Sequence, residues 1–305
     1  MELLLKDGSE VVVVDDFTGG KSHKILEKVE VVHGSIVSLD TFTVIPRPKN
    51  IDGVFHLAAL KSAADSFVNT ENYHDVNVLG TQNLVAFCEQ NQIKNVVFTS
   101  SAAVYGALDL DRAILESDPI EPINPYGSTK KKSEEIIRNF ALLHSNRSAV
   151  LRCFNLAGCT SPEYLDTKAE NIIPVILRSI TNSSPIRIFG ADLKTVDGSC
   201  IRDYIHVSDV AKAHYLAMHY LLKAQPNTLQ ILNVASGRGT SVLQLIHAFK
   251  IFSGKDILLS IESPRVGDPN SSIGYIDNTK SVLDWAPTFT LNEIVKSSLK
   301  TILIS

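Results

Sequence analysis

The chain has 305 residues, of which 44% are hydrophobic and 20% are charged. This length allows a sizeable buried core, in one large domain or in two linked subdomains. The formal net charge of −4 and the pI near 6.1 argue against a general nucleic-acid or membrane-surface binder, because such polyanionic surfaces would not attract the protein.

Short apolar runs alternate with helical patterns through the first half of the chain. Runs that are rich in β-branched residues and nearly continuous are typical of parallel strands buried on both faces. Residues 1–6 are predicted to end a helix that turns at Asp7 and Gly8. The predicted strands are 11–14, 29–32, 54–58, 96–99 and 149–154, and the main predicted helices are 72–92 and 125–145. This order predicts a doubly wound, Rossmann-like α/β sheet.

After Phe154 the pattern becomes less regular, with proline- and glycine-containing loops. Helices are predicted near residues 208–224 and 241–252. The simplest interpretation is a second, smaller α/β lobe. We therefore expect one domain at residues 1–155 and another at residues 156–305.

The four cysteines, Cys88, Cys153, Cys159 and Cys200, do not have the spacing of metal ligands, and three lie in apolar segments. Buried free thiols in a reducing compartment are the expectation. The first ten residues contain only a three-leucine run, and no later stretch approaches the ~18 apolar residues of a membrane span. These features predict a cytoplasmic protein.

Tyr126 and Lys130 are four residues apart, and Tyr126 follows Ser101 by 25 residues. A tyrosine is a poor base at neutral pH because its unperturbed pKa is about 10, but an ammonium one helical turn away favours the phenolate. A hydroxyl from Ser101 at a strand end could share the proton. The three residues predict the acid/base centre of a nicotinamide enzyme. The bare pattern also fits an ordinary helix face with Tyr126 packed and Lys130 solvated.

Asp15 and Asp16 end the first recognisable strand. In a dinucleotide-binding fold an acid at this place accepts hydrogen bonds from the adenosine ribose and repels the extra phosphate of NADP, so NAD is favoured. Taken alone, Asp15 fits a strand-end turn equally well. Such an acid lies about 20 residues after the glycine-rich phosphate loop, whereas only fourteen residues precede Asp15. The loop would have to begin before Met1, so we expect the sheet of this chain to lack its first strand and the glycine-rich loop.

Several further segments occur in an order and spacing that resemble UDP-glucose 4-epimerases of the extended short-chain dehydrogenase/reductase group. The resemblance runs from the first residues to near the end of the chain. It is carried by HLAALK at 56–61, NVLGT at 77–81, SSAAVYG at 100–106, NPYGSTK at 124–130, RCFN at 152–155, IFG at 188–190, DG at 197–198, RDYIHV at 202–207 and PRVGD at 264–268.

The resemblance implies a homodimeric enzyme that interconverts UDP-glucose and UDP-galactose by transient oxidation of C4 with tightly bound NAD. It implies an NAD-binding domain at 1–155, a UDP-sugar-binding domain at 156–305 and no metal. The implied catalytic residues are Ser101, Tyr126 and Lys130. The implied cofactor-binding residues are Asp15, Asp16, Ser35, Ile36, Leu57, Ala58, Ala59, Lys61, Asn77, Ser100, Tyr126, Lys130 and Phe154. The implied substrate-binding residues are Ser101, Asn155, Asn171, Ile172, Phe189, Arg202, Arg265 and Asp268.

Alternatives remain for single residues and for the chain. Taken alone, Lys61 also fits a solvated loop lysine, and Asn77 also fits a helix cap. Arg202 and Arg265 also fit surface ion pairs. Sugar-nucleotide 4,6-dehydratases are disfavoured because Ala102 and Ala103 stand where they need an acid/base pair. An oxidoreductase that releases its cofactor would use the same tyrosine and lysine. Without the glycine-rich loop, and with Ser35 where the family has an aspartate, a catalytically silent protein that binds a UDP-sugar or a partner is the second hypothesis.

Overall fold

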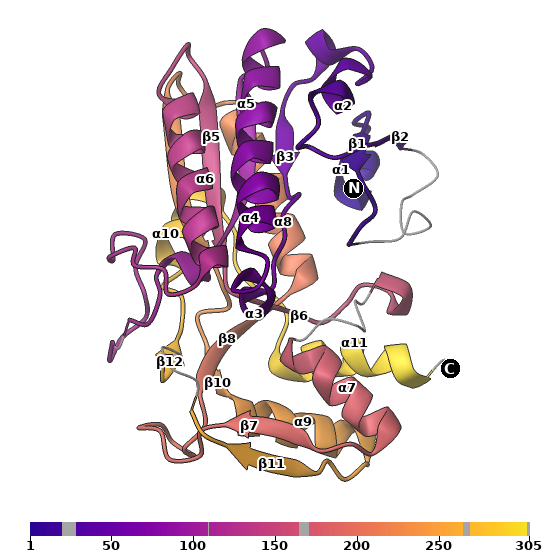
Figure 1. The fold of residues 1–305 in the computed structure, drawn as a ribbon, viewed down its shortest axis with the longest axis vertical. Coiled ribbons are helices and arrows are strands. Elements are labelled where there is room, and N and C mark those ends of the chain that lie inside the picture. The colour runs from indigo at the N-terminus through magenta and orange to yellow at the C-terminus, as the bar shows by residue number, and fades with distance from the viewer. Residues whose placement is uncertain (20–28, 109, 165–170, 265–268, 304–305) are drawn as a thin grey trace. The chain divides into compact units, whose positions relative to one another are not determined.

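The structure of the protein is a computed structural model that describes residues 1–19, 29–108, 110–164, 171–264 and 269–303 (Figure 1). The chain divides into two compact units. Unit 1 comprises Met1–Val104, Pro122–Arg152 and Lys212–Leu232, and unit 2 comprises Tyr105–Glu121, Cys153–Ala211 and Asn233–Ser305. Each unit is therefore assembled from segments that are far apart in the sequence.

A four-stranded sheet forms most of the core of unit 1. Its strands are β3 (Val54–His56), β4 (Asn95–Ser101), β5 (Arg147–Cys153) and β9 (Thr228–Val234), in the order β3-β4-β5-β9. β3 and β4 are parallel, with Val54 opposite Val96. Most residues of β4 and β5 are buried, as expected for strands covered on both faces. These features confirm the α/β fold predicted from the alternating apolar runs.

Helices pack on one face of this sheet. They are α4 (Thr70–His74), the π-helical turn η3 (Asp75–Leu79), α5 (Gly80–Gln90) and α6 (Pro125–Ala141). Leu84 and Phe87 of α5, Ile137 of α6 and Phe98 of β4 belong to one buried apolar cluster. The predicted helix at 72–92 thus exists, but a π-helical turn interrupts it.

Helix α8 (Val207–Leu221) reaches the opposite face of β4. Successive strand residues point to opposite faces, and Thr99 follows Phe98, which belongs to the apolar cluster under α5 and α6. The Oγ1 atom of Thr99 lies 2.7 Å from Nε2 of His214 on α8. The sheet therefore has helices on both faces, which is the doubly wound arrangement.

A separate parallel pair is formed by β1 (Val12–Asp15) and β2 (Glu30–His33), with helices α1 (Glu2–Lys6) and α2 (Leu39–Thr43) in the same segment. The turn predicted after residue 6 is present, with Gly8 at φ +80°. Among the described strands, β1 pairs only with β2 and β3 only with β4. The residues of β1 are half-buried or exposed, and of β2 only Val32 is buried, so the prediction of strands buried on both faces was wrong for these two strands. Among the described strands, β1 and β2 form a two-stranded sheet, so each has one edge without a strand neighbour, which adds to its exposure.

Unit 2 contains two further sheets. β8 (Ile201–His206) pairs with β6 (Asn155–Ala157), β10 (Gly239–Ser241) and β12 (Ser271–Ser272), and β7 (Ile186–Phe189) pairs in parallel with β11 (Leu259–Glu262). Helices α7 (Ile172–Asn182), α9 (Val242–Ser253) and α11 (Leu291–Leu303) supply most of its apolar core, and α10 (Asp277–Leu283) follows β12. The predicted helices near 208 and 241 correspond to α8 and α9.

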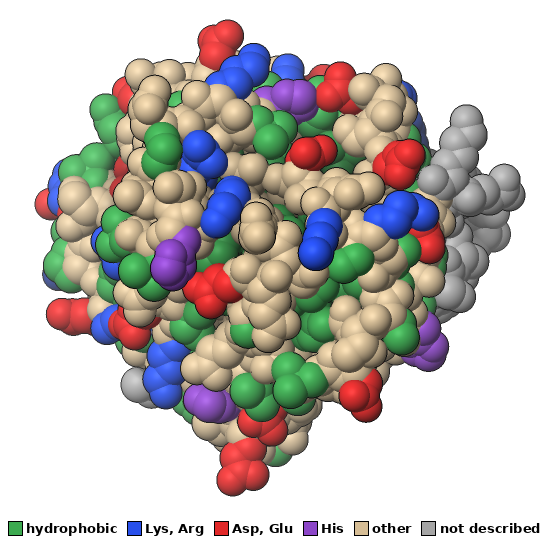
Figure 2. All heavy atoms as spheres, turned by 90° about the horizontal axis from the view of Figure 1, so that it is seen from above, with side chains coloured by type: hydrophobic (Ala, Val, Ile, Leu, Met, Phe, Trp, Pro, Cys, Tyr) green, Lys and Arg blue, Asp and Glu red, His purple; other side chains and the backbone are tan. Residues whose placement is uncertain are grey.

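Three properties bear on the environment of the protein. All four cysteines are buried and free, as predicted. Within the described ranges, no helix has both the length and the apolar character needed to cross a membrane. On the face that Figure 2 shows, basic and acidic side chains are interspersed rather than gathered into fields of one sign.

Candidate active site

Helix α6 presents Tyr126, Lys130 and Glu134 on one face, because residues four apart lie one above the other. The helix begins with Pro125 at its first position, and Oδ1 of Asn124 caps it by accepting a hydrogen bond from the N–H of Gly127 at 2.8 Å. The cap fixes the first turn, which contains the half-buried Tyr126.

The ammonium group of Lys130 is buried in unit 1. The residue is only 4% exposed, and its Nζ donates a hydrogen bond to the carbonyl oxygen of Thr99 at 2.9 Å. The same nitrogen lies 4.9 Å from the centroid of the Phe98 ring, a distance typical of a cation–π contact. These contacts exclude the alternative in which Lys130 is an ordinary solvated lysine.

Ser101 is the last residue of β4 and is half-buried. Its Oγ accepts a hydrogen bond from the N–H of Ala103 at 3.2 Å, within the 3-10 turn η4 (Ala102–Val104). This turn packs closely on α6. A Cβ atom at Gly127 would lie 2.5 Å from the carbonyl oxygen of Ala103, so glycine permits the segment after Ser101 to approach the helix that carries Tyr126.

A buried ion pair supports the same helix face. Arg152 of β5, 1% exposed, donates from Nε and Nη2 to the two carboxylate oxygens of Glu134 at 3.0 and 2.8 Å. The hydroxyl of Ser100 donates to Oε1 of Glu134 at 2.5 Å. Ser100 was predicted to contact the cofactor. Its side-chain hydroxyl bonds the buried Glu134. Sequence reasoning gave no role to Glu134 and none to Arg152 beyond its place in a motif.

His56 at the end of β3 is a buried, neutral neighbour of Lys130. Burial and then the charge of Lys130 lower the pKa of His56 to about 3. Its Nε2 lies 2.8 Å from Oγ1 of Thr81, which uses its own proton to bond the carbonyl oxygen of Asn77. Nε2 therefore carries the hydrogen and donates it to Thr81.

Asn77 lies in the middle of the π-helical turn η3, a feature that often marks functional sites. Its Oδ1 accepts from the N–H of Leu60 at 2.8 Å, and its Nδ2 donates to the carbonyl oxygen of Leu60 at 3.0 Å and to Oγ1 of Thr129 at 2.9 Å. The alternative of a helix cap was therefore wrong, because Asn77 instead binds the loop that contains the exposed Lys61.

A cavity of about 440 Å³ lies beside the carboxyl end of β1. Two of the predicted cofactor residues, Asp16 and Ser35, line it. Its full lining is Asp16, Thr18, Gly19, Ser35, Val37, Leu60, Asn72, Asp75 and Val76. The Oδ1 atom of Asp16 accepts from the N–H and the hydroxyl of Thr18 at 3.0 and 2.6 Å.

The other predicted cofactor residues lie elsewhere. Asp15 is exposed, and its Oδ1 accepts from the N–H of Phe17 at 2.7 Å, as expected for a strand-end turn. The side chain of Ile36 is buried against Gly80. Leu57 and Ala58 are exposed and Ala59 is half-buried in the segment after β3. Phe154, in unit 2, is buried with its ring centroid 6.5 Å from that of Tyr105.

The described substrate-binding candidates, apart from Ser101, lie in unit 2. Arg202 on β8 is half-buried, and its Nη1 donates to the carbonyl oxygens of Ile201 and Pro269, both at 2.9 Å. Asn155 begins β6 and is exposed, opposite Tyr204 in the parallel pair of β6 and β8.

Other candidates of unit 2 lie at the ends of elements. Asn171 precedes α7 without capping it, and Ile172 is the first residue of that helix. Phe189 ends β7, with the guanidinium carbon of Arg187 5.9 Å from its ring centroid. Arg265 and Asp268 lie outside the described residues.

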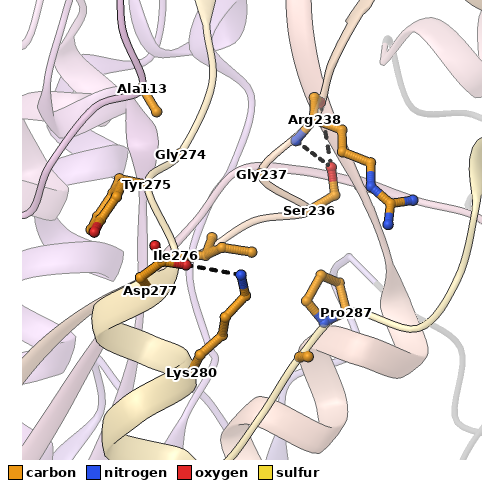
Figure 3. Close-up of a pocket in the computed structure, with 11 residues that line it drawn as sticks. Ala113, Ser236, Gly237, Arg238, Gly274, Tyr275, Ile276, Asp277, Lys280 and Pro287 are labelled. Carbon is orange, nitrogen blue, oxygen red and sulfur yellow. Dashed lines mark hydrogen bonds and ion pairs between the residues drawn. The ribbon is translucent and has the colours of Figure 1, made fainter.

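A second cavity, of about 510 Å³, lies within unit 2 and is lined by none of the predicted site residues (Figure 3). Two of its lining residues are basic, Arg238 and Lys280. Lys280 points toward Asp277, with which it forms an ion pair at 2.9 Å. One wall is fixed by the buried Asp203, whose carboxylate accepts from the N–H groups of Ser236, Gly237 and Gly274.

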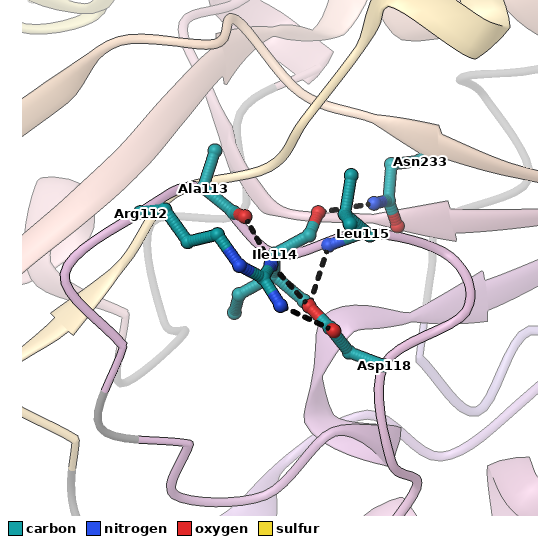
Figure 4. A network of polar contacts seen from close by, with 6 residues as sticks. All are labelled: Arg112, Ala113, Ile114, Leu115, Asp118 and Asn233. Atoms are coloured by element: carbon teal, nitrogen blue, oxygen red, sulfur yellow. Dashed lines mark hydrogen bonds and ion pairs between the residues drawn. The ribbon is translucent and has the colours of Figure 1, made fainter.

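The loop of unit 2 that precedes α6 is also fixed by side-chain contacts (Figure 4). Arg112 donates to both carboxylate oxygens of Asp118, at 2.8 and 2.7 Å, and this contact lowers the pKa of Asp118. The amide nitrogen of Asn233 donates to the carbonyl oxygen of Ile114 at 2.8 Å. This loop is therefore ordered by a bidentate pair of the kind that gives strong directional contacts.

Comparison with known proteins gives a consistent result. Residues 1–235 match the model of the NAD dependent epimerase/dehydratase family. A UDP-glucose 4-epimerase from Azospirillum brasilense is 34% identical over 304 residues, which cover 98% of this chain and 86% of that protein. A UDP-glucose 4-epimerase from Halalkalibacterium halodurans is 35% identical over 297 residues, covering 94% and 86%.

Solved structures of such enzymes share the fold. A UDP-glucose 4-epimerase from Stenotrophomonas maltophila, solved with bound NAD and formylated UDP-arabinopyranose, superimposes with a TM-score of 0.92 at 29% identity, covering 99% of this chain and 93% of that one. The enzyme from Brucella ovis in complex with NAD gives a TM-score of 0.91 at 29% identity, covering 98% and 93%. These likenesses confirm the fold class expected from the motifs.

Proposed function

We propose that this chain, which belongs to the NAD dependent epimerase/dehydratase family, interconverts UDP-glucose and UDP-galactose by inverting C4 of the sugar. The observation that carries the proposal is the face of α6. Its buried Lys130 is bonded to β4 at Thr99, and Tyr126 lies one turn before Lys130. Relatives with that activity match almost the whole chain.

NAD is the proposed cofactor. Residues of unit 1 suit both its adenosine and its nicotinamide ribose. A hydroxyl and a carboxylate, those of Ser35 and Asp16, face the 440 Å³ cavity and suit an adenosine, because both can accept hydrogen bonds. The carboxylate also disfavours the extra phosphate of NADP. At the other end, Lys130 and Tyr126 would contact the nicotinamide ribose, and the exposed Lys61 would face the pyrophosphate.

The proposed chemistry is a proton transfer at the sugar 4-hydroxyl. Bound NAD supplies a reversible two-electron acceptor for C4. Tyr126, as phenolate, would remove the hydroxyl proton, and Ser101 would hydrogen-bond the same oxygen. The ammonium of Lys130 would stabilise the phenolate by Coulomb attraction, which is strong in a buried site.

Inversion requires the sugar to turn over while the UDP stays bound. Strong binding therefore belongs on the diphosphate and weak binding on the sugar. We propose that Arg202 and Arg265 bind the phosphates, because a guanidinium can bind a phosphate bidentately. Asp268 would accept a hydrogen bond from a hydroxyl of the uridine ribose. The rest of the pocket would be formed by Asn155, Asn171, Ile172 and Phe189. In this scheme residues 1–155 bind the cofactor and residues 156–305 bind the UDP-sugar.

Two wider properties are proposed with the activity. Four free, buried cysteines support a cytoplasmic location. A homodimer through the helices at residues 72–92 and 125–145 is proposed from the family resemblance, as a symmetric four-helix contact.

The test is an assay of UDP-galactose conversion by the purified chain, with bound NAD measured by its absorbance after denaturation. Conversion to UDP-glucose with NAD retained through the cycle supports the proposal. UDP binding measured by calorimetry without any conversion, even with added NAD, would instead support a catalytically silent UDP-sugar-binding protein.

A further inference from the structure

Two side chains from consecutive turns of one helical segment bind the backbone on both sides of Lys61. Asn77 accepts from the N–H of Leu60 at 2.8 Å and donates to its carbonyl oxygen at 3.0 Å. The hydroxyl of Tyr73 accepts from the N–H of Ser62 at 3.0 Å and donates to its carbonyl oxygen at 2.7 Å. Both backbone groups of each flanking residue are thus held, and Lys61 is the one residue between them.

Tyr73 and Asn77 together form a clamp on the backbone around Lys61. The clamp is buried, whereas Lys61 is exposed. Tyr73 is 1% exposed and Asn77 is buried, whereas Lys61 is exposed. Burial, reinforced by Asp65, raises the pKa of Tyr73, so the phenol keeps the proton that it donates to Ser62 throughout the physiological range. Ser62 also caps α3 (Ala63–Ser66) by accepting from the N–H of Asp65 at 3.2 Å. Both ends of the short segment are therefore fixed.

The same two residues contact the helix that carries Tyr126. The ring of Tyr73 meets the ring of Tyr126 edge to face, with centroids 6.4 Å apart and planes at 81°. Nδ2 of Asn77 donates to Oγ1 of Thr129, which donates to the carbonyl oxygen of Tyr126 at 2.8 Å. Tyr73 and Asn77 therefore link the backbone on either side of Lys61 to the start of α6 through one contact each, the ring of Tyr126 for Tyr73 and the hydroxyl of Thr129 for Asn77.

We infer that Tyr73 is a positioning residue, which together with Asn77 fixes the backbone from which the side chain of Lys61 extends toward the diphosphate of a dinucleotide, while its ring holds Tyr126. The inference rests on the proposed function, because it takes the diphosphate as the anion that Lys61 faces. A lysine on a fixed backbone binds an anion better than one on a mobile loop, since less backbone conformational entropy is lost on binding.

The test compares Tyr73→Phe with Tyr220→Phe. Phenylalanine keeps the ring against Tyr126 and removes only the hydroxyl. Tyr220 on α8 is half-buried, and its hydroxyl accepts from Nε2 of Gln230 at 3.0 Å, so Tyr220→Phe removes a comparable hydrogen bond away from the clamp. The readouts are hydrogen exchange of the amides in residues 57–66 and the Kd for NADH, measured by its fluorescence.

For Tyr73→Phe we expect faster exchange in residues 57–66 and about 10-fold weaker NADH binding, the loss expected for one or two hydrogen bonds. Tyr220→Phe should change neither quantity. Asn77→Asp, which keeps the acceptor for Leu60 and removes both donors, should shift both quantities in the same direction. Unchanged exchange and unchanged Kd in Tyr73→Phe would overturn the inference, as would an equal change in Tyr220→Phe.

A double-mutant cycle with Lys61→Met separates positioning from simple structural support. If Tyr73 acts through Lys61, introducing Tyr73→Phe into the wild-type chain weakens NADH binding. Introducing it into the Lys61→Met variant has little further effect. Additive losses would show that Tyr73 acts without Lys61 and would overturn the inference. If the wild-type chain, after removal of any bound NAD, binds no NADH, the proposed function has failed instead, and the exchange of residues 57–66 alone then decides whether the clamp exists.

Discussion

The Nζ atom of Lys130 donates a hydrogen bond to the carbonyl oxygen of Thr99, 2.9 Å away. The bond joins the middle of α6 to the end of β4, one residue before Ser100 and two before Ser101. A buried ammonium is costly unless it is paired or hydrogen-bonded. The carbonyl oxygen and the ring of Phe98 at 4.9 Å supply part of this compensation, and the arrangement keeps a positive charge one turn from Tyr126.

Replacing Lys130 with methionine is expected to lower kcat for UDP-galactose conversion by at least about 100-fold, the lower end of acid/base contributions. Methionine fills a similar volume but supplies no charge for the phenolate. The carbonyl oxygen of Thr99 also loses a donor, at a cost of about 1–3 kcal/mol in unfolding free energy. Lys132→Met, at an exposed position of the same helix, is the control and should keep wild-type rates. Equal kcat values for the two variants would remove Lys130 from the mechanism.

Replacing Tyr126 with phenylalanine should abolish turnover while NAD remains bound. The ring keeps its edge contact with Tyr73, so the fold of the first turn of α6 should survive. The expected loss in kcat is about 100- to 10,000-fold, because the proton acceptor is gone. Conversion of UDP-galactose and the absorbance of released NAD are measured together. Wild-type-like rates in this variant would contradict the assignment of Tyr126 as the base.

The sequence predicted the positions of most strands and helices in unit 1 because their signals are local. Buried parallel strands appear as apolar β-branched runs, and α6 has a proline start and an asparagine cap in the sequence itself. Arg152 offered a further signal, since an arginine within an otherwise apolar strand needs a buried partner. Glu134 lies four residues after Lys130 on a helix face, so the pairing of Glu134 with Arg152 could have been proposed from the sequence.

Other features depend on tertiary approach and left no local pattern. The two bonds of Tyr73 to Ser62 join a helix residue to a loop eleven positions earlier, and no periodicity marks such a contact. The π-helical turn at Asn77 lies inside a segment whose composition is that of an ordinary helix. The half-burial of β1 likewise depends on which strands pair beside it, which its run of valines does not reveal.

Removing one partner of the buried ion pair should be strongly destabilising. Glu134→Gln leaves Arg152, 1% exposed, without the carboxylate that receives two of its N–H groups. Breaking such a pair costs about 3–5 kcal/mol. Urea denaturation followed by circular dichroism measures the change in unfolding free energy.

The double variant Glu134→Leu with Arg152→Met tests the origin of that loss. Replacing both charges by apolar groups should recover much of the stability, because the unpaired charge is the main cost. Glu135→Gln, at the exposed neighbouring position, is the control and should change stability by less than about 0.5 kcal/mol. A double variant no more stable than Glu134→Gln would show that the carboxylate matters for packing rather than for charge.

His56 should make the protein acid-sensitive in a defined pH window. Its pKa is about 3 in the fold and about 6.5 in an unfolded chain, so between these values the unfolded state binds one proton more than the folded state. Stability therefore falls as the pH drops below about 6.5, by up to about 1.4 kcal/mol per pH unit from this residue, and the loss levels off near pH 3. Above pH 7 both states are neutral at His56 and it contributes no pH dependence.

The variant His56→Asn isolates this contribution, because the amide can still donate to Oγ1 of Thr81 but does not titrate. Unfolding free energies from urea titrations between pH 7 and pH 4.5 should decline less steeply in the variant than in the wild type. Burial also lowers the pKa of His206, so a smaller slope is expected to persist in both proteins. His144→Asn, at an exposed position with φ +51° that asparagine tolerates, should keep the wild-type slope. Identical slopes in His56→Asn and the wild type would mean that folding does not lower the pKa of His56, and would contradict the inferred effect of burial and of the Lys130 ammonium.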